Sequence, residues 1–408
     1  MGKGQHAISI SDTIQPKRDQ TTSFAIVSPS YPPDHCGVGD HTSMLAATLA
    51  ADGARVNVYT TRGAPRSTPP RVHVHPVVPH WQAVSMWTLA STITRTRPNV
   101  VLIQYVPFLY ARHVGFAASF LALFLRLRGI AVVTIVHEPY VPLELNVKRF
   151  ILSVAQRVML VMLMLSSRRV AVTTMMLAHQ LRRLLPWFGE RVHRVPVGSN
   201  IVMHRIDQSE RRALRGALGV APDGAVLVFF GSLHETKLLG LILRTFVYLR
   251  ESGVAATLLI VGQDQATFSA AAAKAGLTVP AEVICTGYAT TEEVSHYLQC
   301  GDLMLAPFMD GVSTRRTTVV AALQHGLPVV STEGRCTERP IFAGAVSMTP
   351  CHDEEGYVRA AHRLAHDPIA RRGLSEQGRQ LAEQRFSWPA IARSLIDEPT
   401  RGSEVKVS

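Results

Sequence analysis

The residues best suited to chemistry lie at the start of segment 310–332, where a turn of small residues precedes two arginines. The segment begins Asp-Gly-Val-Ser-Thr-Arg-Arg, and the pattern that follows predicts a helix over 315–325. Free amide groups and the positive dipole end at a helix start attract anions. Arg315 and Arg316 add planar, multi-donor cations, which suit a cluster of anionic oxygens. The sequence predicts an anion site here, and the competing interpretation is an arginine pair on a solvated helix face. Further predicted contacts are Asp310, Gly311, Ser313 and Thr314.

A second candidate segment, residues 230–237, reads Phe-Gly-Ser-Leu-His-Glu-Thr-Lys and follows an apolar run. Gly231 and Ser232 form a turn after the predicted strand. Lys237 then stands at the start of the next helix, where its ammonium group is within reach of the same anion. The segment is not a P-loop, because that motif has a second glycine directly before its lysine.

Two glycines and a histidine are the candidates in the N-terminal half. Gly37 and Gly39 follow the first predicted strand, and glycine lets the backbone approach a ligand closely. This G-x-G lacks the third glycine of the dinucleotide fingerprint, which disfavours nicotinamide binding. His137 ends another predicted strand, where the competing interpretation is a structural histidine. Val141 stands at the last position of a would-be H-E-x-x-H motif, so zinc hydrolysis is not supported.

The elements that must position these residues follow from the hydrophobic pattern. Short apolar runs alternate with helical patterns, which is typical of parallel strands buried on both faces. In the first half, strands are predicted over 23–28, 55–60, 100–104, 131–136, 169–173 and 192–196, with helices over 40–52, 80–95, 113–129, 147–167 and 174–185. In the second half, strands are predicted over 225–230, 256–261, 282–285, 302–306, 328–331 and 345–348. A chain of 408 residues exceeds one core, so the predicted fold is α/β, with two Rossmann-like doubly wound parallel-sheet domains facing a cleft.

Composition narrows the function classes. The formal net charge of +12 and the isoelectric point near 9.9 indicate attraction to polyanions. Nucleic acid is disfavoured as the partner, because no basic stripe is interleaved with aromatic residues. The five cysteines are odd in number and form no C-x-x-C pair, which predicts reduced thiols rather than disulfides or a zinc site. The first 20 residues lack the apolar stretch of a secretory signal, so a cytoplasmic location is expected.

Two apolar segments bear on contact with a membrane. Residues 158–165 are uniformly apolar and residues 116–125 almost so, and arginines follow both. Neither is long enough to cross a bilayer, which takes about twenty residues. The favoured interpretation is a pair of helices buried in the fold. The alternative is peripheral contact with anionic lipid at the inner face of the membrane.

With these segments in place, the chain resembles a GT-B glycosyltransferase and is most similar to the retaining family 4. The resemblance covers most of residues 22–398. It is carried by Pro33–Thr42, His137, Pro196–Asn200, Gly231–Lys237, Val261–Gly262, Thr286–Tyr288, Asp302–Pro307, Gly326–Val330 and Phe386–Trp388. It implies a disordered tail (1–21), an acceptor-binding domain (22–197), a linker (198–223), a nucleotide-sugar-binding domain (224–385), a C-terminal helix that returns to the first domain (386–398), and a final tail (399–408).

The resemblance also implies the activity, which is sugar transfer from a nucleotide diphosphate to an acceptor hydroxyl in glycan biosynthesis. The enzyme is expected to be a hexosyltransferase that retains configuration and has no cofactor beyond the donor. Cationic side chains replace a metal, since no Asp-x-Asp occurs in the sequence. The implied catalytic residues are His137, Lys237 and Arg315. The implied donor contacts are Gly37, Gly39, Gly231, Ser232, Lys237, Gly287, Tyr288, Asp310, Gly311, Ser313, Thr314, Arg315 and Arg316.

This sequence departs from the family at one point. Family members carry two glutamates eight residues apart, and alignment on Gly326-Leu-Pro-Val places Ser313 and Ala321 at those positions. Donor recognition must therefore use other groups. Two alternatives follow, namely a non-catalytic protein that binds sugar nucleotides or lipids, and a nucleotide-sugar epimerase. The acceptor is expected to be a glycan, an aglycone or a lipid-linked sugar, and no nucleic acid is expected as a partner.

Overall fold

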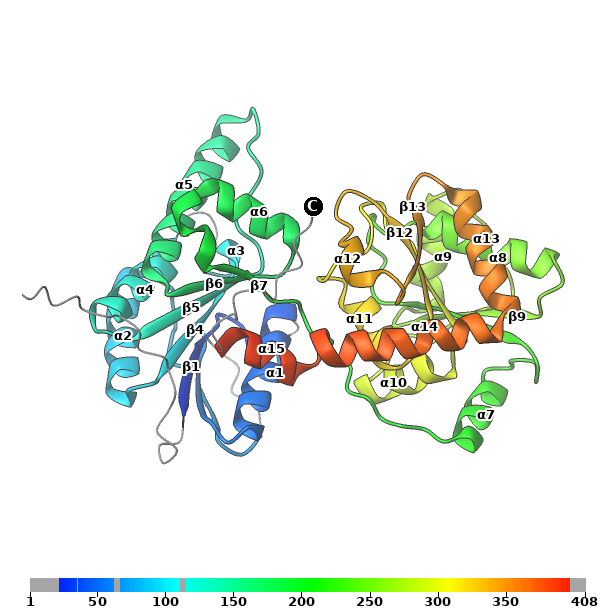
Figure 1. Ribbon diagram of the computed structural model, residues 1–408, viewed down its shortest axis with the longest axis horizontal. Coiled ribbons are helices and arrows are strands. Elements are labelled where there is room, and N and C mark those ends of the chain that lie inside the picture. Colours follow the sequence, from blue (N-terminus) through cyan, green and yellow to red (C-terminus); the bar gives the residue numbers. More distant parts are fainter. Residues whose placement is uncertain (1–21, 35, 62–66, 111–114, 397–408) are drawn as a thin grey trace, which may run out of the picture.

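The computed structural model describes residues 22–34, 36–61, 67–110 and 115–396, and the tails predicted at 1–21 and 399–408 lie outside this part of the chain. The described residues form two α/β domains side by side (Figure 1). Each domain contains a parallel sheet with helices packed against it. The predicted fold class, two Rossmann-like parallel-sheet domains, is confirmed.

The first domain is built on a seven-stranded sheet in the order β3-β2-β1-β4-β5-β6-β7. Its strands are β1 (Ser23–Val27), β2 (Arg55–Tyr59), β3 (Val72–His75), β4 (Val100–Tyr105), β5 (Ala131–Val136), β6 (Arg169–Val172) and β7 (Val192–Arg194). Its helices are α1 (Gly37–Ala51), α2 (Ala83–Thr96), α3 (Pro107–Tyr110), α4 (Ala117–Leu127), α5 (Val147–Ser166), α6 (Met175–Leu184) and the 3-10 helix η1 (Pro186–Arg191).

The second domain is built on a six-stranded sheet in the order β10-β9-β8-β11-β12-β13. Its strands are β8 (Ala225–Phe230), β9 (Ala256–Val261), β10 (Val283–Cys285), β11 (Leu303–Ala306), β12 (Val329–Glu333) and β13 (Ser347–Pro350). Its helices are α7 (Gln208–Ala217), α8 (Leu239–Glu251), α9 (Gln265–Lys274), α10 (Thr291–Cys300), α11 (Thr317–Gln324), α12 (Arg339–Phe342), α13 (Glu354–His366) and α14 (Pro368–Leu381).

The core of each domain lies on both faces of its sheet, because successive strand residues point in opposite directions. In β1, Ala25 and Val27 belong to one buried cluster, whereas Phe24 and Ile26 belong to the other. In β8, Val226 and Val228 face one cluster and Leu227 faces the other. This two-sided burial explains why the strands read as uninterrupted apolar runs.

Among the elements missing from the sequence prediction are strand β3 and helix α7. Strand β3 has the sequence Val-His-Val-His at the edge of the first sheet, where half-exposed histidines interrupt the apolar pattern. Helix α7 lies inside the predicted linker 198–223, and all of its side chains are at least partly exposed. It is held by charge: Arg211 and Arg215 lie 2.9 and 3.0 Å from the Asp302 carboxylate, which also accepts a hydrogen bond from Val226 N.

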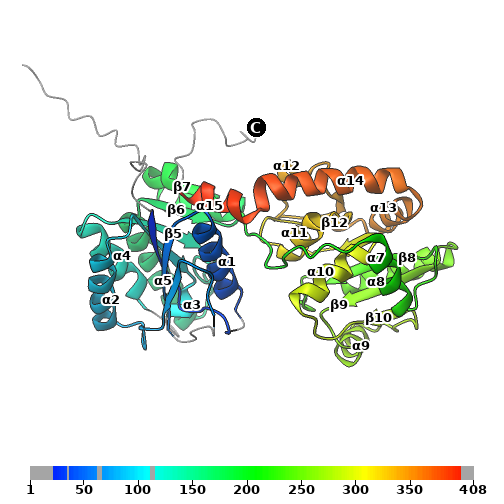
Figure 2. The same ribbon diagram turned by 90° about the horizontal axis from the view of Figure 1, so that it is seen from below.

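The C-terminal segment crosses from the second domain back to the first. After α14 come the π-helix η2 (Ala382–Phe386) and helix α15 (Trp388–Ile396), which lies beside α1 (Figure 2). Ile391 and Leu395 of α15 are buried in the first domain's core, and Trp388 Nε1 donates to Ser199 O at 2.8 Å. A Cβ on Gly198 would lie 2.9 Å from the Trp388 ring, so the segment between the domains is tightly covered.

Candidate functional site

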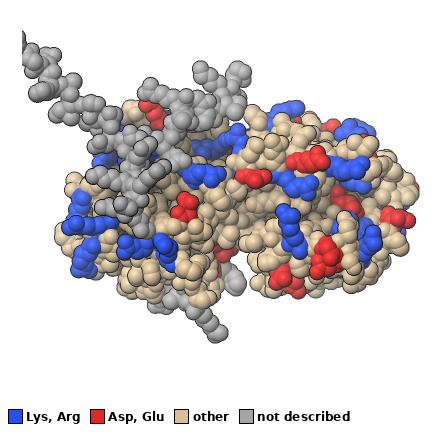
Figure 3. All heavy atoms as spheres, turned by 60° about the horizontal axis from the view of Figure 1, so that its bottom comes forward, with Lys and Arg blue, Asp and Glu red and all other residues tan. Residues whose placement is uncertain are grey.

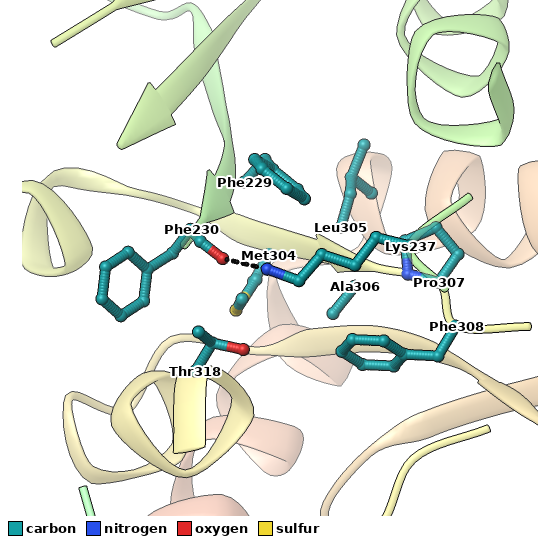
Figure 4. Close-up of a pocket in the computed structure, with 9 residues that line it drawn as sticks. All are labelled: Phe229, Phe230, Lys237, Met304, Leu305, Ala306, Pro307, Phe308 and Thr318. Atoms are coloured by element: carbon teal, nitrogen blue, oxygen red, sulfur yellow. Dashed lines mark hydrogen bonds between the residues drawn. The ribbon is translucent and has the colours of Figure 1, made fainter. Parts of the chain in front are cut away.

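The candidate site of the second domain lies where its strand order reverses, between β8 and β11. In an open parallel sheet, such a reversal leaves a crevice at the carboxyl ends of the strands, and ligands bind there. Lys237 lies in this crevice with Phe229 and Phe230 of β8, Ala306 of β11 and Thr318 of α11 (Figure 4).

Gly231 makes the turn that gives Lys237 its position. The φ angle of Gly231 is +98°, a conformation that favours glycine. A Cβ at this residue would lie 2.8 Å from Thr318 Cγ2 and 3.0 Å from Lys237 Nζ. The turn, the ammonium group and the first turn of α11 are therefore close together.

The backbone around Lys237 is joined to the segment after β11. Lys237 pairs with Phe308 in an antiparallel bridge, and Met309 N donates to Thr236 O at 2.8 Å. The Lys237 ammonium group donates to Phe230 O at 3.2 Å and lies 4.8 Å from the centre of the Phe229 ring. These contacts hold the ammonium group at the crevice.

The Lys237 ammonium group is held at an electrostatic cost. Burial, together with the nearby positive charge of Arg316, lowers its pKa to about 8. At neutral pH the group is mostly protonated but poorly solvated. A bound anion would relieve both effects, because it supplies an opposite charge where water has been removed.

Arg316 does not point freely at this anion position. Its guanidinium group forms a salt bridge with Asp310 and lies 4.2 Å from the centre of the Phe308 ring. Both charged side chains are largely buried. The prediction that Arg316 contributes its charge to an anion is therefore corrected: Asp310 already pairs with the guanidinium group, and the pair lies against Phe308, which lines the crevice. Arg315 is exposed.

The turn at 311–314 is packed rather than open. Gly311 has a φ angle of +85°, and a Cβ there would lie 2.4 Å from Gly334 N. Ser313 and Thr314 are buried, and helix α11 begins at Thr317, two residues later than predicted. The amide of Thr314 donates to Glu338 Oε2 at 2.6 Å. The prediction that this amide faces a diphosphate is therefore wrong, because a buried carboxylate already occupies it.

Glu338 joins the two domains through this turn. Its Oε1 accepts a hydrogen bond from Met175 N at 2.8 Å and lies 3.7 Å from a guanidinium nitrogen of Arg194. Thr314 Oγ1 also donates to Thr173 O at 2.6 Å. The loops after β6 and β11 therefore meet, so the carboxyl ends of the two sheets face each other.

The loops after β9 and β10 complete the second domain's side of the site. Gln263 Nε2 donates to Gly231 O at 3.5 Å, and Gly287 N donates to Gln263 O at 2.9 Å. Gly287, predicted as a donor contact, is thereby joined to Gly231. Tyr288 is 87% exposed and Ser232 is also exposed, so both are accessible from solvent.

The first domain contributes a histidine pair bridged by an amide, in which His41 is buried and His137 is partly buried. His137 Nε2 lies 2.7 Å from Gln104 Oε1, and Gln104 Nε2 lies 3.2 Å from His41 Nδ1. The two imidazole rings meet edge to face at 4.9 Å. Because the Gln104 oxygen only accepts, His137 Nε2 donates and the proton on this ring is fixed.

Both histidines of this pair are neutral at physiological pH. Burial lowers the pKa of His137 to about 4, and it also holds the pKa of His41 well below its usual value. A neutral His137 that donates from Nε2 retains a lone pair on Nδ1. Such a nitrogen can accept a hydrogen bond from a sugar hydroxyl.

The glycines predicted as donor contacts in the first domain belong to helix α1. Gly37 is its first residue, and Gly39 is buried in its first turn. A Cβ on Gly39 would lie 3.0 Å from Ser30 Oγ and 3.2 Å from Tyr31 N. The demand for glycine at Gly39 therefore arises from packing of the helix start against the loop after β1.

The structure thus separates the predicted residues. In the second domain, Gly231, Lys237 and Gly287 lie around the crevice, with the Arg316–Asp310 pair behind Phe308. The buried turn holds Gly311, Ser313 and Thr314, whereas Ser232, Tyr288 and Arg315 are exposed. The first domain holds Gly37, Gly39 and His137. Sequence reasoning missed Gln104, His41, Thr318 and Glu338. Of these, only Gln104 could have been recognised in the sequence, because it is an amide within the apolar strand Val-Val-Leu-Ile-Gln-Tyr.

Known proteins resemble both halves of the chain. Residues 36–198 match the family model described as "Glycosyl transferase 4-like domain", and residues 224–367 match the model described as "Glycosyl transferases group 1". A D-inositol 3-phosphate glycosyltransferase from Saccharomonospora viridis is 28% identical over 249 residues, which are 56% of this chain and 54% of that protein. The chain therefore matches only about half of the length of that curated relative.

Solved structures extend the likeness over the whole fold. Sucrose-phosphate synthase from Thermosynechococcus elongatus superposes with a TM-score of 0.65 at 16% identity, covering 92% of this chain and 97% of that one. Anabaena HepE, solved in complex with UDP and glucose, gives a TM-score of 0.63 at 15% identity, covering 92% and 98%. The two family matches, one in each domain, together with this architecture show that the chain belongs to the GT-B glycosyltransferases of the family 4 type.

Proposed function

We propose that this protein transfers a hexose from a nucleotide diphosphate to an acceptor hydroxyl, with retention of configuration and without a metal. The observation that carries the proposal is the position of Lys237: a partly desolvated ammonium group at the strand reversal, in contact with the Gly231 turn and the start of α11. A diphosphate suits this position, because it is an anion that needs both a cation and backbone donors.

The proposed reaction breaks the bond between the anomeric carbon and the diphosphate oxygen. Negative charge develops on the departing phosphate, and preorganised cations at that point lower the barrier. Lys237 supplies this charge from within the crevice, and Arg315 supplies it from the exposed edge. The acceptor hydroxyl attacks from the same face, and its proton passes to an oxygen of the leaving phosphate. His137, held by Gln104, positions the sugar through Nδ1.

The proposal of metal independence rests on the residues available. No Asp-x-Asp occurs in the sequence. Within the described ranges, no three His, Cys, Asp or Glu side chains gather as ligands for a metal ion. The two positions at which the family has glutamates also lie inside packed protein, since Ser313 is 2% exposed and Ala321 is fully buried. Recognition of the donor sugar is therefore assigned to groups other than paired carboxylates.

The first test is a thermal-shift panel of UDP, GDP, ADP and dTDP on the wild type and on Lys237→Ala. A ligand present at a hundred times its dissociation constant stabilises the folded state by about 2.7 kcal/mol. One nucleotide is expected to stabilise the wild type and to lose this effect in Lys237→Ala. Lys274→Ala is the matched control, because Lys274 is an exposed lysine on α9 of the same domain. A shift that Lys237→Ala preserves would contradict the proposed diphosphate site.

Turnover separates the proposed transferase from its two alternatives. With the preferred donor, transfer should need an acceptor and should persist in EDTA, whereas strict dependence on Mg²⁺ would refute metal independence. Epimerisation of the donor without an acceptor would identify an epimerase. Binding without turnover of any donor would identify a non-catalytic protein. We place the protein in the cytoplasm on the grounds that the substrate class and the five free cysteines suit that compartment.

A further inference from the structure

Three helices cover one face of the first domain's sheet and present an outer surface to solvent. Helices α2, α4 and α5 are neighbours: Trp87 of α2 meets Phe124 of α4 edge to face at 4.9 Å, and Ser119 of α4 donates to Met159 O of α5 at 2.8 Å. Helices α2 and α4 lie on the side of this domain remote from the second domain, and α5 extends beyond the sheet (Figure 1).

Helix α5 is apolar on both sides. Its inner side buries residues such as Met159, Leu160 and Leu163. Its outer side carries Val147, Ile151, Val154, Val158 and Leu165, which are all exposed. The spacing of three, four and seven residues between these positions places them in one line along the helix. The favoured interpretation of the sequence was a buried helix. The structure corrects it for α5, because a continuous apolar stripe of this helix faces solvent.

The apolar stripe continues over the neighbouring helices and the loop before α5. Leu145 in that loop is fully exposed, and Leu127 of α4 is 74% exposed. We define the apolar helix face as the exposed apolar residues of this layer, which are Val84 and Trp87 of α2, Phe120, Leu123 and Leu127 of α4, Leu143 and Leu145 of the loop, and Val147, Phe150, Ile151, Val154, Val158 and Leu165 of α5.

The domain that carries this face also carries the chain's excess positive charge. Residues 22–197 include 18 Lys and Arg against 6 Asp and Glu, whereas residues 198–396 include 19 of each. In Figure 3, Lys and Arg are spread over the N-terminal domain, whereas Asp and Glu lie mainly on the second. Exposed cations border the apolar helix face. Lys148 lies in the first turn of α5, and Arg126 and Arg128 lie at the C-terminal end of α4. The Arg128 guanidinium group lies 5.2 Å from the centre of the Trp87 ring.

We propose that the apolar helix face docks on an anionic lipid bilayer. A bilayer offers a hydrocarbon boundary for the apolar residues and negative headgroups for the bordering cations. A second copy of the chain fits less well, because two N-terminal domains of the same positive charge repel each other. Nucleic acid supplies the negative charge but no apolar surface.

Helix α5 lies along the bilayer in this proposal and does not cross it. Its 20 residues are long and apolar enough to span a membrane, but the inner side is part of the folded domain. The buried Gln156 accepts a hydrogen bond from Val141 N at 2.8 Å, and the buried Ser153 donates to Val141 O at 2.6 Å. Insertion across the bilayer would break these bonds and expose the core of the domain.

The loop 138–146 connects this face to the candidate site. It begins directly after His137 and ends directly before Val147, the first residue of α5. Docking through α5 and Leu145 would therefore place the first domain's side of the site next to the lipid surface. Acceptors anchored in that surface would then reach the site without leaving the membrane.

The test is sedimentation of the full chain with vesicles of phosphatidylcholine alone or mixed with phosphatidylglycerol. The wild type should bind the mixed vesicles and not the neutral ones, and high salt should weaken the binding. The key variant carries Ile151→Ser, Val154→Ser and Val158→Ser, which keep the charge unchanged. Since each buried CH₂ group contributes about fourfold to partitioning, the affinity of this variant should fall by at least about 100-fold.

The control variant carries Tyr248→Ser and Ile369→Ser, which remove exposed apolar side chains from the second domain. It should bind the mixed vesicles as the wild type does, and circular dichroism should show that all three proteins are folded. The proposal is overturned if the wild type ignores anionic vesicles or if the triple variant binds as tightly. Sedimentation velocity tests whether a second copy of the chain covers the apolar helix face instead. A wild-type dimer that becomes monomeric in the triple variant would assign the face to self-association and overturn the proposal.

Discussion

Replacing Lys237 by methionine should make the free protein more stable and the diphosphate site weaker. Lys237 lies at the candidate site because the Gly231 turn and the 308 segment hold it there, and not because the position stabilises a charge. Burial and Arg316 together lower its pKa from 10.5 to about 8. Methionine has a similar length and keeps the packing against the Phe229 ring, but it carries no charge to desolvate.

The magnitude follows from the pKa difference. A pKa that is lower in the folded state by this amount corresponds to at most about 3 kcal/mol of destabilisation at neutral pH, at 1.36 kcal/mol for each pKa unit. The variant also loses the hydrogen bond to Phe230 O, which contributes about 1 kcal/mol. We therefore expect Lys237→Met to raise the free energy of unfolding at pH 7 by about 1–2 kcal/mol.

The pH dependence has a definite sign. Between pH 8 and 10.5 the unfolded lysine remains protonated while the folded one has lost its proton, so the unfolded state binds more protons. Wild-type stability relative to the variant should therefore rise with pH across this window, and the advantage of methionine should disappear by pH 10.5. Urea denaturation of both proteins at pH 7 and at pH 10.5 measures this difference.

The same substitution should weaken binding of the preferred nucleoside diphosphate. A hydrogen bond to a charged group contributes about 1.5–3 kcal/mol, which corresponds to a loss of affinity of about 10- to 150-fold. Titration calorimetry at pH 7 measures it, with Lys274→Met as the control. The reasoning would be refuted if Lys237→Met were less stable than the wild type and bound the nucleotide as tightly, because Lys237 would then be a structural residue.

Three further predictions test other parts of the site. Gly231→Ala should displace Thr318 and Lys237 and strain a backbone at φ +98°, which should lower stability by about 1–2 kcal/mol. It should also weaken nucleotide binding more than the control Gly216→Ala does, since Gly216 has open space around it among the described residues. Denaturation and calorimetry compare the two variants. Glu338→Ala should lower stability by about 3–5 kcal/mol, because the backbone amides of Met175 and Thr314 lose their acceptor and Arg194 loses its ion-pair partner. Urea denaturation measures this, and a loss below about 1 kcal/mol would contradict the contact. The pKa of His137 is lowered from 6.5 to about 4, so the unfolded state binds more protons between these two pH values. Wild-type stability should therefore fall as the pH decreases through this window, and His137→Gln should reduce the fall by about 3 kcal/mol. An unchanged pH dependence of the free energy of unfolding would count against a neutral His137 ring.

The contact through Glu338 has a consequence for domain closure. Its carboxylate accepts hydrogen bonds from Thr314 of the second domain and from Met175 of the first, so the two sheets are held with their carboxyl ends together. Val197 and Gly198 lie at the hinge, which is the segment that joins the two domains between β7 and α7. Here the Trp388 ring covers Gly198, and Val197 N donates to Thr314 O at 3.4 Å. Opening would therefore have to break contacts at both the hinge and the cleft.

The sequence by itself determined the strands and the order of the motifs. Strands buried on both faces are apolar at nearly every position, so runs such as Ala225–Phe230 are recognisable without knowledge of their partners. The glycine turn at Gly231 and the lysine that follows could also be placed, because a strand end and a helix start fix the loop between them. Edge strand β3 and the polar helix α7 could not, since neighbours in space stabilise them rather than a local pattern.

Only the tertiary structure decided which charged groups are free and which surface is exposed. Arg316 and Lys237 look equivalent in the sequence, but Asp310 neutralises the first and the second remains partly desolvated. The amide of Thr314 looks available until Glu338, 24 residues later, is brought against it. Helix α5 carries apolar residues on two opposite sides, and the packing of the domain selects the side that stays in water. In each case the environment of the group depends on a partner that is distant in the sequence, and the fold brings this partner into contact.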